Sequence, residues 1–370
     1  MIYRSFDDGD KEHSLLGFGI MRMPTNEDAS INFELAEKMI DTAYNAGVNY
    51  FDTAYVYHKM KSEEFLGKAL AKYPRESFFI ATKLPLWHVD GYDDLDVVFN
   101  RHLSSLNMDY IDYYLVHAVN KERVQRVKDM QLIDWLIQKK AQGKIRHIGF
   151  SFHDDLDCLK DMLSLYDWDF CQLQINYADW NRFNAKDMYE IATNAGVPII
   201  VMEPVRGGML ANPAPEVASL LKEHSPDLSY ANWAFRFVAN LDNVKLILSG
   251  MSTIEQVEDN LATFATEQSI ELTDDESKIL NKAINVLDNL KSIPCTACDY
   301  CMPCPFGVHI PTCFEKYNTA QIFGKANYTE IAEENRADKC VSCEACVPLC
   351  PQHIQIPERM VEVRDYFATK

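Results

Sequence analysis

Long apolar runs are missing from this chain of 370 residues. No stretch approaches the ~20 apolar residues that a membrane-spanning helix needs. A basic excess is missing too, because 36 Lys and Arg stand against 55 Asp and Glu, and the formal net charge is −19. Nucleic acids and anionic membranes bind basic faces, so neither is an expected partner. The first residues also lack the basic-then-apolar order of a signal peptide, and we expect a cytoplasmic protein.

Cysteine is nearly absent from the first 290 residues, where only Cys158 and Cys171 occur. The other nine of the eleven cysteines fall between Cys295 and Cys350. A disulfide framework is not expected in a long chain without an export signal, whereas cysteines crowded near one end indicate a metal site. The two early cysteines are interpreted as small buried hydrophobic residues.

The first 250 residues alternate short β-rich apolar runs with longer stretches of helical period. The runs lie at residues 15–23, 48–54, 78–83, 110–117, 145–151, 170–176, 197–203 and 244–250. Segments such as 33–47 and 131–143 have the apolar spacing of amphipathic helices that end at a glycine. Eight strands alternating with helices predict an α/β fold, a (β/α)8 TIM barrel. The alternative, a doubly wound open sheet, would normally carry a glycine-rich loop after its first strand, and no G-x-G-x-x-G stands there.

A domain boundary is predicted near residue 290. An acidic helix punctuated by Leu and Ile is expected over residues 270–290, and the Ser-Ile-Pro at 292–294 breaks its pattern. We therefore expect a barrel over residues 1–290 and a small cysteine-rich domain over residues 291–370.

Two motifs organise the cysteines of this second domain. CTACDYCMPCP contains Cys295, Cys298, Cys301 and Cys304, and CVSCEACVPLCP contains Cys340, Cys343, Cys346 and Cys350. Three cysteines at two-residue gaps hold three irons of one cubane, while a proline-marked fourth cysteine typically ligates the other cluster. The second motif matches the bacterial C-x2-C-x2-C-x3-C-P run, and the first is one residue shorter before its last cysteine. Structural zinc is the alternative, although zinc sites usually use two separated C-x2-C pairs.

The cysteine-rich region resembles a bacterial-type ferredoxin domain with two [4Fe-4S] clusters. The resemblance implies a small fold of helices and loops with crossed ligation. One cluster would be held by Cys295, Cys298, Cys301 and Cys350, and the other by Cys340, Cys343, Cys346 and Cys304. Cys313 is then left over and is interpreted as a small buried residue.

Polar or ionisable side chains follow three of the predicted barrel strands. Asp52 and Tyr57 follow the second strand, and Lys83 and His117 end the third and the fourth. Taken singly, they could be a helix cap, a rim aromatic, a solvated lysine and a buried histidine. In a barrel these strand ends meet on one face, where catalytic residues lie. An acid, a phenol, an amine and an imidazole together indicate a proton-transfer site.

The segments around these residues resemble the aldo/keto reductase superfamily over most of residues 15–265. The motifs are FDTAYVYHKMKSEEFLGKAL, ATK, DYYLVH, GKIRHIGFS, QINY and LSGMSTIEQVEDNL. The resemblance implies that a nicotinamide cofactor delivers hydride to a carbonyl, or accepts it from an alcohol, and that Tyr57 donates the proton. Lys83 would favour the phenolate of Tyr57, and Asp52 would hold Lys83 in place. His117 would orient the substrate oxygen or share its proton.

The resemblance also implies a site for NAD(H) or NADP(H). Ser151 and Gln174 would bind the carboxamide, and the loop after the eighth strand would bind the phosphates through Gly250, Ser252, Gln256 and Asn260. Members that prefer NADPH usually place basic residues in this loop, and neither Lys nor Arg stands at the matching positions here. Met202 takes the position where many members have an aromatic residue. NADH is therefore predicted to bind at least as well as NADPH. Arg206 either replaces part of the missing charge or is a rim arginine.

The appended clusters leave two functions open. A reductase barrel needs no iron, so the clusters either fold a core-poor tail or exchange electrons with a ferredoxin-like partner. The main prediction is an oxidoreductase acting on a small carbonyl or alcohol. The alternative is an iron–sulfur electron-transfer protein whose barrel binds substrate without nicotinamide. A sensor module with a degenerate pocket is a third class, and the complete set of four catalytic positions argues against it.

Overall fold

The computed structural model describes residues 1–6, 11–181, 184–289, 292–323 and 326–369. By contacts between Cα atoms the chain forms two compact units. The barrel unit consists of Met1–Pro204 and Ala231–Leu272, and the cysteine unit consists of Val205–Tyr230 and Thr273–Lys370. The predicted domain boundary falls on residues 290 and 291, which lie outside the described residues.

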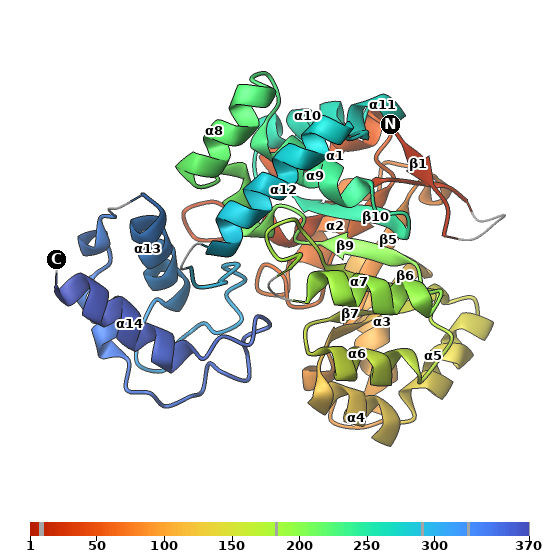
Figure 1. The fold of residues 1–370 in the computed structure, drawn as a ribbon. Coiled ribbons are helices and arrows are strands. Elements are labelled where there is room, and N and C mark those ends of the chain that lie inside the picture. Colours follow the sequence, from red (N-terminus) through yellow and green to blue (C-terminus); the bar gives the residue numbers. More distant parts are fainter. Residues whose placement is uncertain (7–10, 182–183, 290–291, 324–325, 370) are drawn as a thin grey trace. The chain divides into compact units, whose positions relative to one another are not determined.

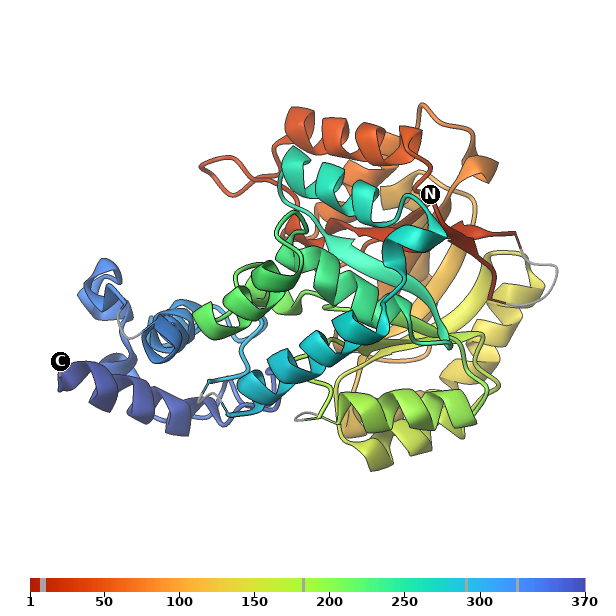
Figure 2. The same ribbon diagram turned by 45° about the horizontal axis from the view of Figure 1, so that its top comes forward.

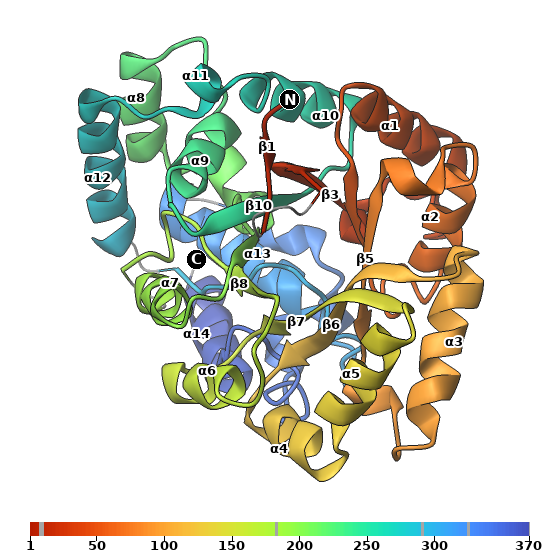
Figure 3. The same ribbon diagram turned by 90° about the vertical axis from the view of Figure 1, so that its right-hand side faces the viewer.

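The barrel unit is a closed barrel of eight parallel strands, as the sequence predicts (Figure 1, Figure 3). The strands are β3 (Leu16–Gly19), β4 (Tyr50–Asp52), β5 (Phe79–Leu84), β6 (Ile111–Val119), β7 (Ile145–Phe152), β8 (Phe170–Gln174), β9 (Ile199–Met202) and β10 (Val244–Gly250). Each lies within, or within two residues of, a predicted run. Pairing of β10 with β3 closes the barrel and sets Gly250 opposite Gly19.

Aromatic and aliphatic side chains fill the interior at the N-terminal end of the strands. The sequence did not predict the short hairpin of β1 (Tyr3–Arg4) and β2 (His13–Ser14), which brings Phe6 into this cluster and His13 beside it. Their rings lie 4.4 Å apart, and the His13 ring also contacts aromatic rings of the strands. The cluster contains Phe6, Tyr50, Phe79, Ala81, Tyr113, Leu115, Phe170, Ile200, Leu246 and Leu248.

Amphipathic helices cover the outside of the barrel. α1 (Phe33–Asn45) begins where the Asn32 side chain accepts a hydrogen bond from the Leu35 amide, and it packs beside α10 (Ile254–Thr263) (Figure 2). Gly47 follows α1 with a φ of 99°, and a Cβ there would lie 2.5 Å from the Tyr3 hydroxyl. The remaining helices of this unit are α2 (Ser62–Leu70), α3 (Asp94–Leu106), α4 (Lys121–Asp129), α5 (Leu132–Ala141), α6 (Leu156–Leu163), α7 (Ala185–Asn194), α9 (Tyr230–Ala239, from its second residue) and α11 (Glu267–Ile270).

The cysteine unit combines a few helices with long loops. α8 (Pro215–His224) packs against α12 (Asp274–Asn289), and α13 (Ile310–Phe323) packs against α14 (Ile356–Ala368) (Figure 1). Its core is small and includes Ile293, Val308, Ile310, Phe314, Ile354, Ile356, Met360 and Val363. In the described part of both units, no helix has the length and apolar character needed to cross a membrane.

Candidate active site and cysteine centres

The structure brings the four predicted catalytic residues together at the C-terminal ends of neighbouring strands. Asp52 ends β4, Lys83 lies near the end of β5, His117 lies near the end of β6, and Tyr57 lies in the turn after β4. The Lys83 ammonium donates to Asp52 Oδ1 at 2.6 Å and to the Thr53 carbonyl at 2.8 Å. It also lies 5.0 Å from the centre of the Tyr57 ring, and the Tyr57 and His117 rings lie 6.2 Å apart and nearly perpendicular. Lys83 therefore lies between the Asp52 carboxylate and the Tyr57 ring.

Burial controls the charge state of this cluster. Lys83 is only 1% exposed, and both Asp52 and His117 are buried. Desolvation raises the pKa of Asp52, and the Lys83 charge opposes that rise. Desolvation lowers the pKa of His117 well below its usual range, and the charges of Lys83 and Arg123 lower it further. At neutral pH His117 is thus a neutral imidazole that can offer one donor and one acceptor.

A second buried network, absent from the sequence predictions, fixes the strands behind the site. Glu63 in α2 accepts from the Thr82 hydroxyl at 2.6 Å and lies 2.6 Å from His102 Nδ1 in α3. Because Thr82 precedes Lys83, this network holds β5 against α2 and α3. Glu63 lies inside a quoted family motif, but its partner His102 is 39 residues away and carries no local signal.

Two further side chains near His117 were missed by sequence reasoning. The Trp87 ring lies 5.0 Å from the His117 ring and is 39% exposed. The guanidinium of Arg123 lies 4.5 Å over the Trp87 ring and donates to the Ala118 carbonyl. An exposed aromatic directly after a strand end, as in TKLPLW, was the available signal for Trp87. These residues give the site an aromatic surface with a cation beside it.

The predicted carboxamide ligands also lie at strand ends. Ser151 is the second-last residue of β7, and its hydroxyl accepts a hydrogen bond from the Ala118 amide at 2.7 Å. Gln174 ends β8 and donates to Asp179 Oδ2 at 2.8 Å. Met202 ends β9, the next strand. The three side chains therefore share the end of the barrel on which the catalytic cluster lies.

The loop after β10 is ordered by its own polar side chains. The Ser252 amide donates to Gln256 Oε1 at 2.8 Å, and Asn260 donates to the Ser249 hydroxyl at 2.9 Å. Gly250 starts this loop, and Thr253 caps the N-terminus of α10. Amide groups at a helix N-terminus favour anions, so this loop could hold a diphosphate.

A cation does lie beside this loop, although sequence reasoning found none. Arg22 follows β3, and its backbone carbonyl accepts from the Ser252 hydroxyl at 2.7 Å. A Cβ on Gly250 would lie 3.3 Å from its side chain, and its guanidinium lies 3.7 Å from Glu203. No sequence signal reveals this approach, since it depends on closure of the barrel between β3 and β10.

Arg206 lies in the cysteine unit. It is buried and donates to Met209 Sδ at 3.2 Å. Burial raises the pKa of the Cys295 thiol to about 11, and the charge of Arg206 opposes this rise. Its predicted role toward a cofactor phosphate stays a prediction.

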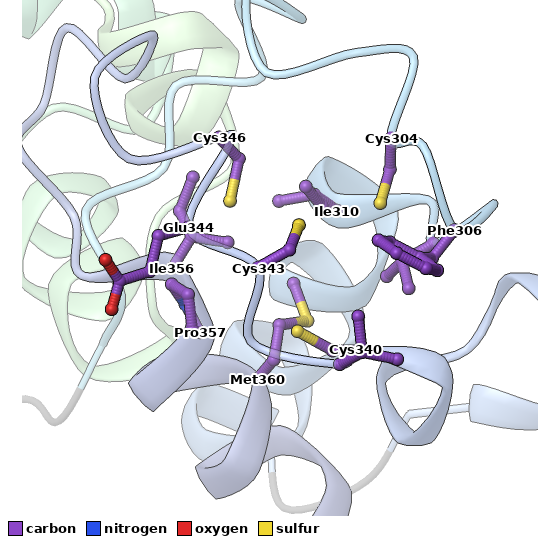
Figure 4. Close-up of a pocket in the computed structure, with 12 residues that line it drawn as sticks. Cys304, Phe306, Ile310, Cys340, Cys343, Glu344, Cys346, Ile356, Pro357 and Met360 are labelled. Carbon is purple, nitrogen blue, oxygen red and sulfur yellow. The ribbon is translucent and has the colours of Figure 1, made fainter.

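The eight motif cysteines gather around two cavities. Cavity 1 is lined by Cys295, Cys298, Cys301 and Cys350, and cavity 2 by Cys304, Cys340, Cys343 and Cys346 (Figure 4). These are the two crossed sets that the ferredoxin resemblance implies. Four thiols around each cavity fit the donor set of a [4Fe-4S] cubane.

The three remaining cysteines lie away from these two cavities. Cys313 is fully buried and lies 3.7 Å from the Asn335 carbonyl and 3.8 Å from the Tyr328 hydroxyl. Cys158 and Cys171 are buried in the barrel unit, and burial raises the pKa of both thiols. All three are packed as small apolar side chains.

Comparison with known proteins agrees with this geometry. A model described as the aldo/keto reductase family matches residues 15–285, and one described as a 4Fe-4S dicluster domain matches residues 294–354. Probable aldo-keto reductase 1 of Glycine max is 26% identical over 206 residues, which cover 53% of this chain and 57% of that protein. The match thus spans less than two thirds of this relative.

Two further similarities cover more of the barrel. The NADH-specific methylglyoxal reductase of Escherichia coli strain K12 is 24% identical over 297 residues, or 67% of this chain and 88% of that protein. The holo form of aldo-keto reductase AKR11C1 from Bacillus halodurans superposes with a TM-score of 0.63 at 25% identity, covering 76% of this chain and 96% of the other.

Proposed function

This chain belongs to the aldo/keto reductase family, and we propose that it reduces a small carbonyl compound, or oxidises the matching alcohol, with Tyr57 as the proton donor. The contacts of Lys83 carry this proposal, because one ammonium lies 2.6 Å from Asp52 and 5.0 Å from the Tyr57 ring. A bound NAD(H) or NADP(H) would supply or accept the hydride. Proton transfer, orientation and exclusion of water fall to the residues of the chain.

Tyr57 needs help to exchange a proton near neutral pH, because a free phenol has a pKa of ~10. The ammonium of Lys83 stabilises the phenolate that remains after the proton leaves. Asp52 and the Thr53 carbonyl fix the position of that ammonium. His117, which is neutral, can donate a hydrogen bond to the substrate oxygen and hold it near the phenol.

The cofactor site would use two groups of residues. Ser151 and Gln174 would bind the carboxamide, at the strand ends beside the catalytic cluster. Gly250, Ser252, Gln256 and Asn260 would surround the phosphates at the start of α10. Trp87 and Arg123 would contact the substrate next to His117. The name of the Escherichia coli relative makes methylglyoxal a suitable first substrate for assay.

Replacing Tyr57 by Phe tests the proton donor. We expect Tyr57→Phe to lower kcat for methylglyoxal reduction by about 10²–10⁴, the usual contribution of general acid catalysis. Tyr55→Phe is the matched control, because the Tyr55 hydroxyl instead accepts a hydrogen bond from Arg101. Rates should be compared at equal iron content and equal melting temperature. Retention of kcat within a factor of a few in Tyr57→Phe would refute the role of Tyr57.

We also propose that cavities 1 and 2 hold two [4Fe-4S] clusters. Their ligands would be the two crossed cysteine sets, and the match to a dicluster domain supports this count. Such a domain favours a second candidate function, electron exchange with a ferredoxin-like partner while the barrel binds substrate without nicotinamide. A reducing cytoplasm would suit both functions. Titration of NADH and NADPH against anaerobic protein separates them, since absence of nicotinamide binding would favour the second.

A further inference from the structure

A tight turn after β9 carries a buried arginine in the cysteine unit. Arg206 begins η4 (Arg206–Ala211) and is 4% exposed. Gly207 and Gly208 follow it with φ values of 63° and 96°. Residues with a Cβ rarely adopt these conformations, so the two glycines allow the chain to turn sharply at this arginine.

This turn packs directly on the first cysteine loop. A Cβ on Gly207 would lie 2.6 Å from the carbonyl oxygen of Thr296, so the two backbones approach more closely than any other residue would allow. Thr296 is buried and, like Cys295, lines cavity 1. Arg206 directly precedes Gly207 in this turn, and its own side chain is buried. A buried cation therefore lies beside cavity 1.

The two cavities differ in the charges around them. Each lining contains one exposed carboxylate, Asp299 in cavity 1 and Glu344 in cavity 2, and at Cys295 the charge of Asp299 opposes that of Arg206. Neither cavity has a Lys or Arg among its described lining residues (Figure 4), but Arg206 adjoins cavity 1 through Gly207, which packs on Thr296. Cys343 of this second set is exposed.

We propose that Arg206 raises the reduction potential of the cluster in cavity 1, so that this cluster accepts the first electron. Reduction adds one negative charge to a cluster that four thiolates already make anionic. A buried cation stabilises the added charge, and local charge and solvent exposure are among the factors that set these potentials. The proposal rests on the two clusters proposed above and does not depend on nicotinamide binding.

An anaerobic reductive titration with dithionite, followed by electron paramagnetic resonance, tests the proposal on the full chain. Each cluster takes one electron from dithionite. We expect Arg206→Gln to lower the one-electron equilibrium constant of one cluster at least tenfold, which is about 59 mV, and to leave the other unchanged. Arg206→Lys, which keeps the charge, should stay within about threefold. Arg364→Gln is the control, because Arg364 is exposed on α14 and pairs with Asp365.

Cys298→Ser assigns the signals to the cavities, because Cys298 lines cavity 1 only. Whether the variant alters or loses the cluster of cavity 1, the signal of cavity 2 should stay the same. The signal that Cys298→Ser alters belongs to cavity 1. In the titration of the wild type, that signal should have the higher reduction potential. This test requires no substitution of Arg206. A lower potential for that signal would overturn the proposal. Unchanged potentials in Arg206→Gln at full iron content would also overturn it. A tenfold loss of NADPH affinity without any change in potential would instead assign Arg206 to the cofactor phosphate. Wild-type protein with fewer than eight irons would refute the two clusters themselves.

Discussion

The barrel unit and the cysteine unit differ in what stabilises the fold of each. The barrel buries continuous apolar strands, and it contains charged pairs such as Lys83 with Asp52 inside that packed core. The cysteine unit has a much smaller apolar core, and its eight motif cysteines surround two cavities within it. Small domains that cannot bury enough apolar surface commonly use metals for stability. The comparison suggests that hydrophobic burial folds one unit and metal ligation completes the other.

This difference also affects how each unit places its functional groups. The barrel fixes Lys83 through buried partners on β4, and the Glu63–His102 network fixes the neighbouring strand. Contacts within the chain therefore hold these barrel side chains in place. The proposed clusters would connect the thiols around cavities 1 and 2. Loss of iron should consequently affect the two units very unequally.

Iron removal is expected to have the largest effect. Chelation of iron under oxidising conditions should abolish hydrogen-exchange protection across residues 292–323 and 326–369, because the proposed clusters that would link these loops are lost. Strands β3 to β10 should keep their protection, since their core contains none of the eight motif cysteines. Exchange measured peptide by peptide with mass spectrometry checks both expectations. Equal loss in both units, or no loss in either, would contradict the comparison.

Single cysteine substitutions should divide the iron content in two. We expect about eight irons and eight inorganic sulfides per wild-type chain, following the two-cubane interpretation of the motifs. Cys304→Ala should retain about four of each, because Cys304 belongs only to cavity 2.

Cys313→Ala is the matched control and should keep all eight, since Cys313 lies with Asn335 and Tyr328 away from both cavities. Iron and sulfide assays on anaerobic protein give the numbers. A wild type with four irons would mean that one motif holds no cluster. Zinc without sulfide would show that the cavities serve structural zinc instead.

Much of the barrel could be predicted from the sequence because its signals are local. Each strand is an apolar run between turn residues, and the family motifs lie at the strand ends. The hairpin of β1 and β2 was missed because each strand has two residues and no apolar pattern. The loops of the cysteine unit were placed only through spacing and resemblance, since they have little periodic structure of their own.

The residues that were missed depend on contacts between distant segments. Arg22 meets Ser252 only because the first and last strands of the barrel pair, 230 residues apart in sequence. Arg206 was predicted beside the cofactor, yet it belongs to the cysteine unit, where its neighbour Gly207 packs on Thr296. No local pattern carries this information. The crossed grouping of Cys304 likewise required either a known resemblance or the fold.

Cofactor preference tests whether the barrel provides a charge for an adenosine 2′-phosphate. Such a phosphate needs a cation, and the nearby Arg22 already lies 3.7 Å from Glu203. Losing one charge-assisted hydrogen bond costs about 1.5–3 kcal/mol, or one to two decades of affinity. We therefore expect NADH to bind at least as well as NADPH, and Gln256→Arg to favour NADPH by about tenfold or more.

Fluorescence titration of both cofactors against the wild type and Gln256→Arg checks this preference. Arg22→Gln provides the companion measurement. A wild type that favours NADPH tenfold, and loses that preference in Arg22→Gln, would show that Arg22 supplies the cation despite Glu203.

The smallest expected effect concerns the pH dependence of barrel stability. His13 is fully buried among Phe6, Tyr50 and Tyr113, and burial lowers its pKa to about 3. Below pH ~6.5 the unfolded chain binds a proton that the folded barrel excludes, so stability falls as the pH decreases. One such histidine costs about 1 kcal/mol between pH 6.5 and 5.5. His13→Leu should remove this part of the acid sensitivity, whereas His224→Leu, at an exposed position, should keep it. Urea unfolding at pH 6.5 and 5.5 measures the change in the free energy of unfolding of the barrel. An equal change in all three proteins would show that His13 is protonated in the folded barrel.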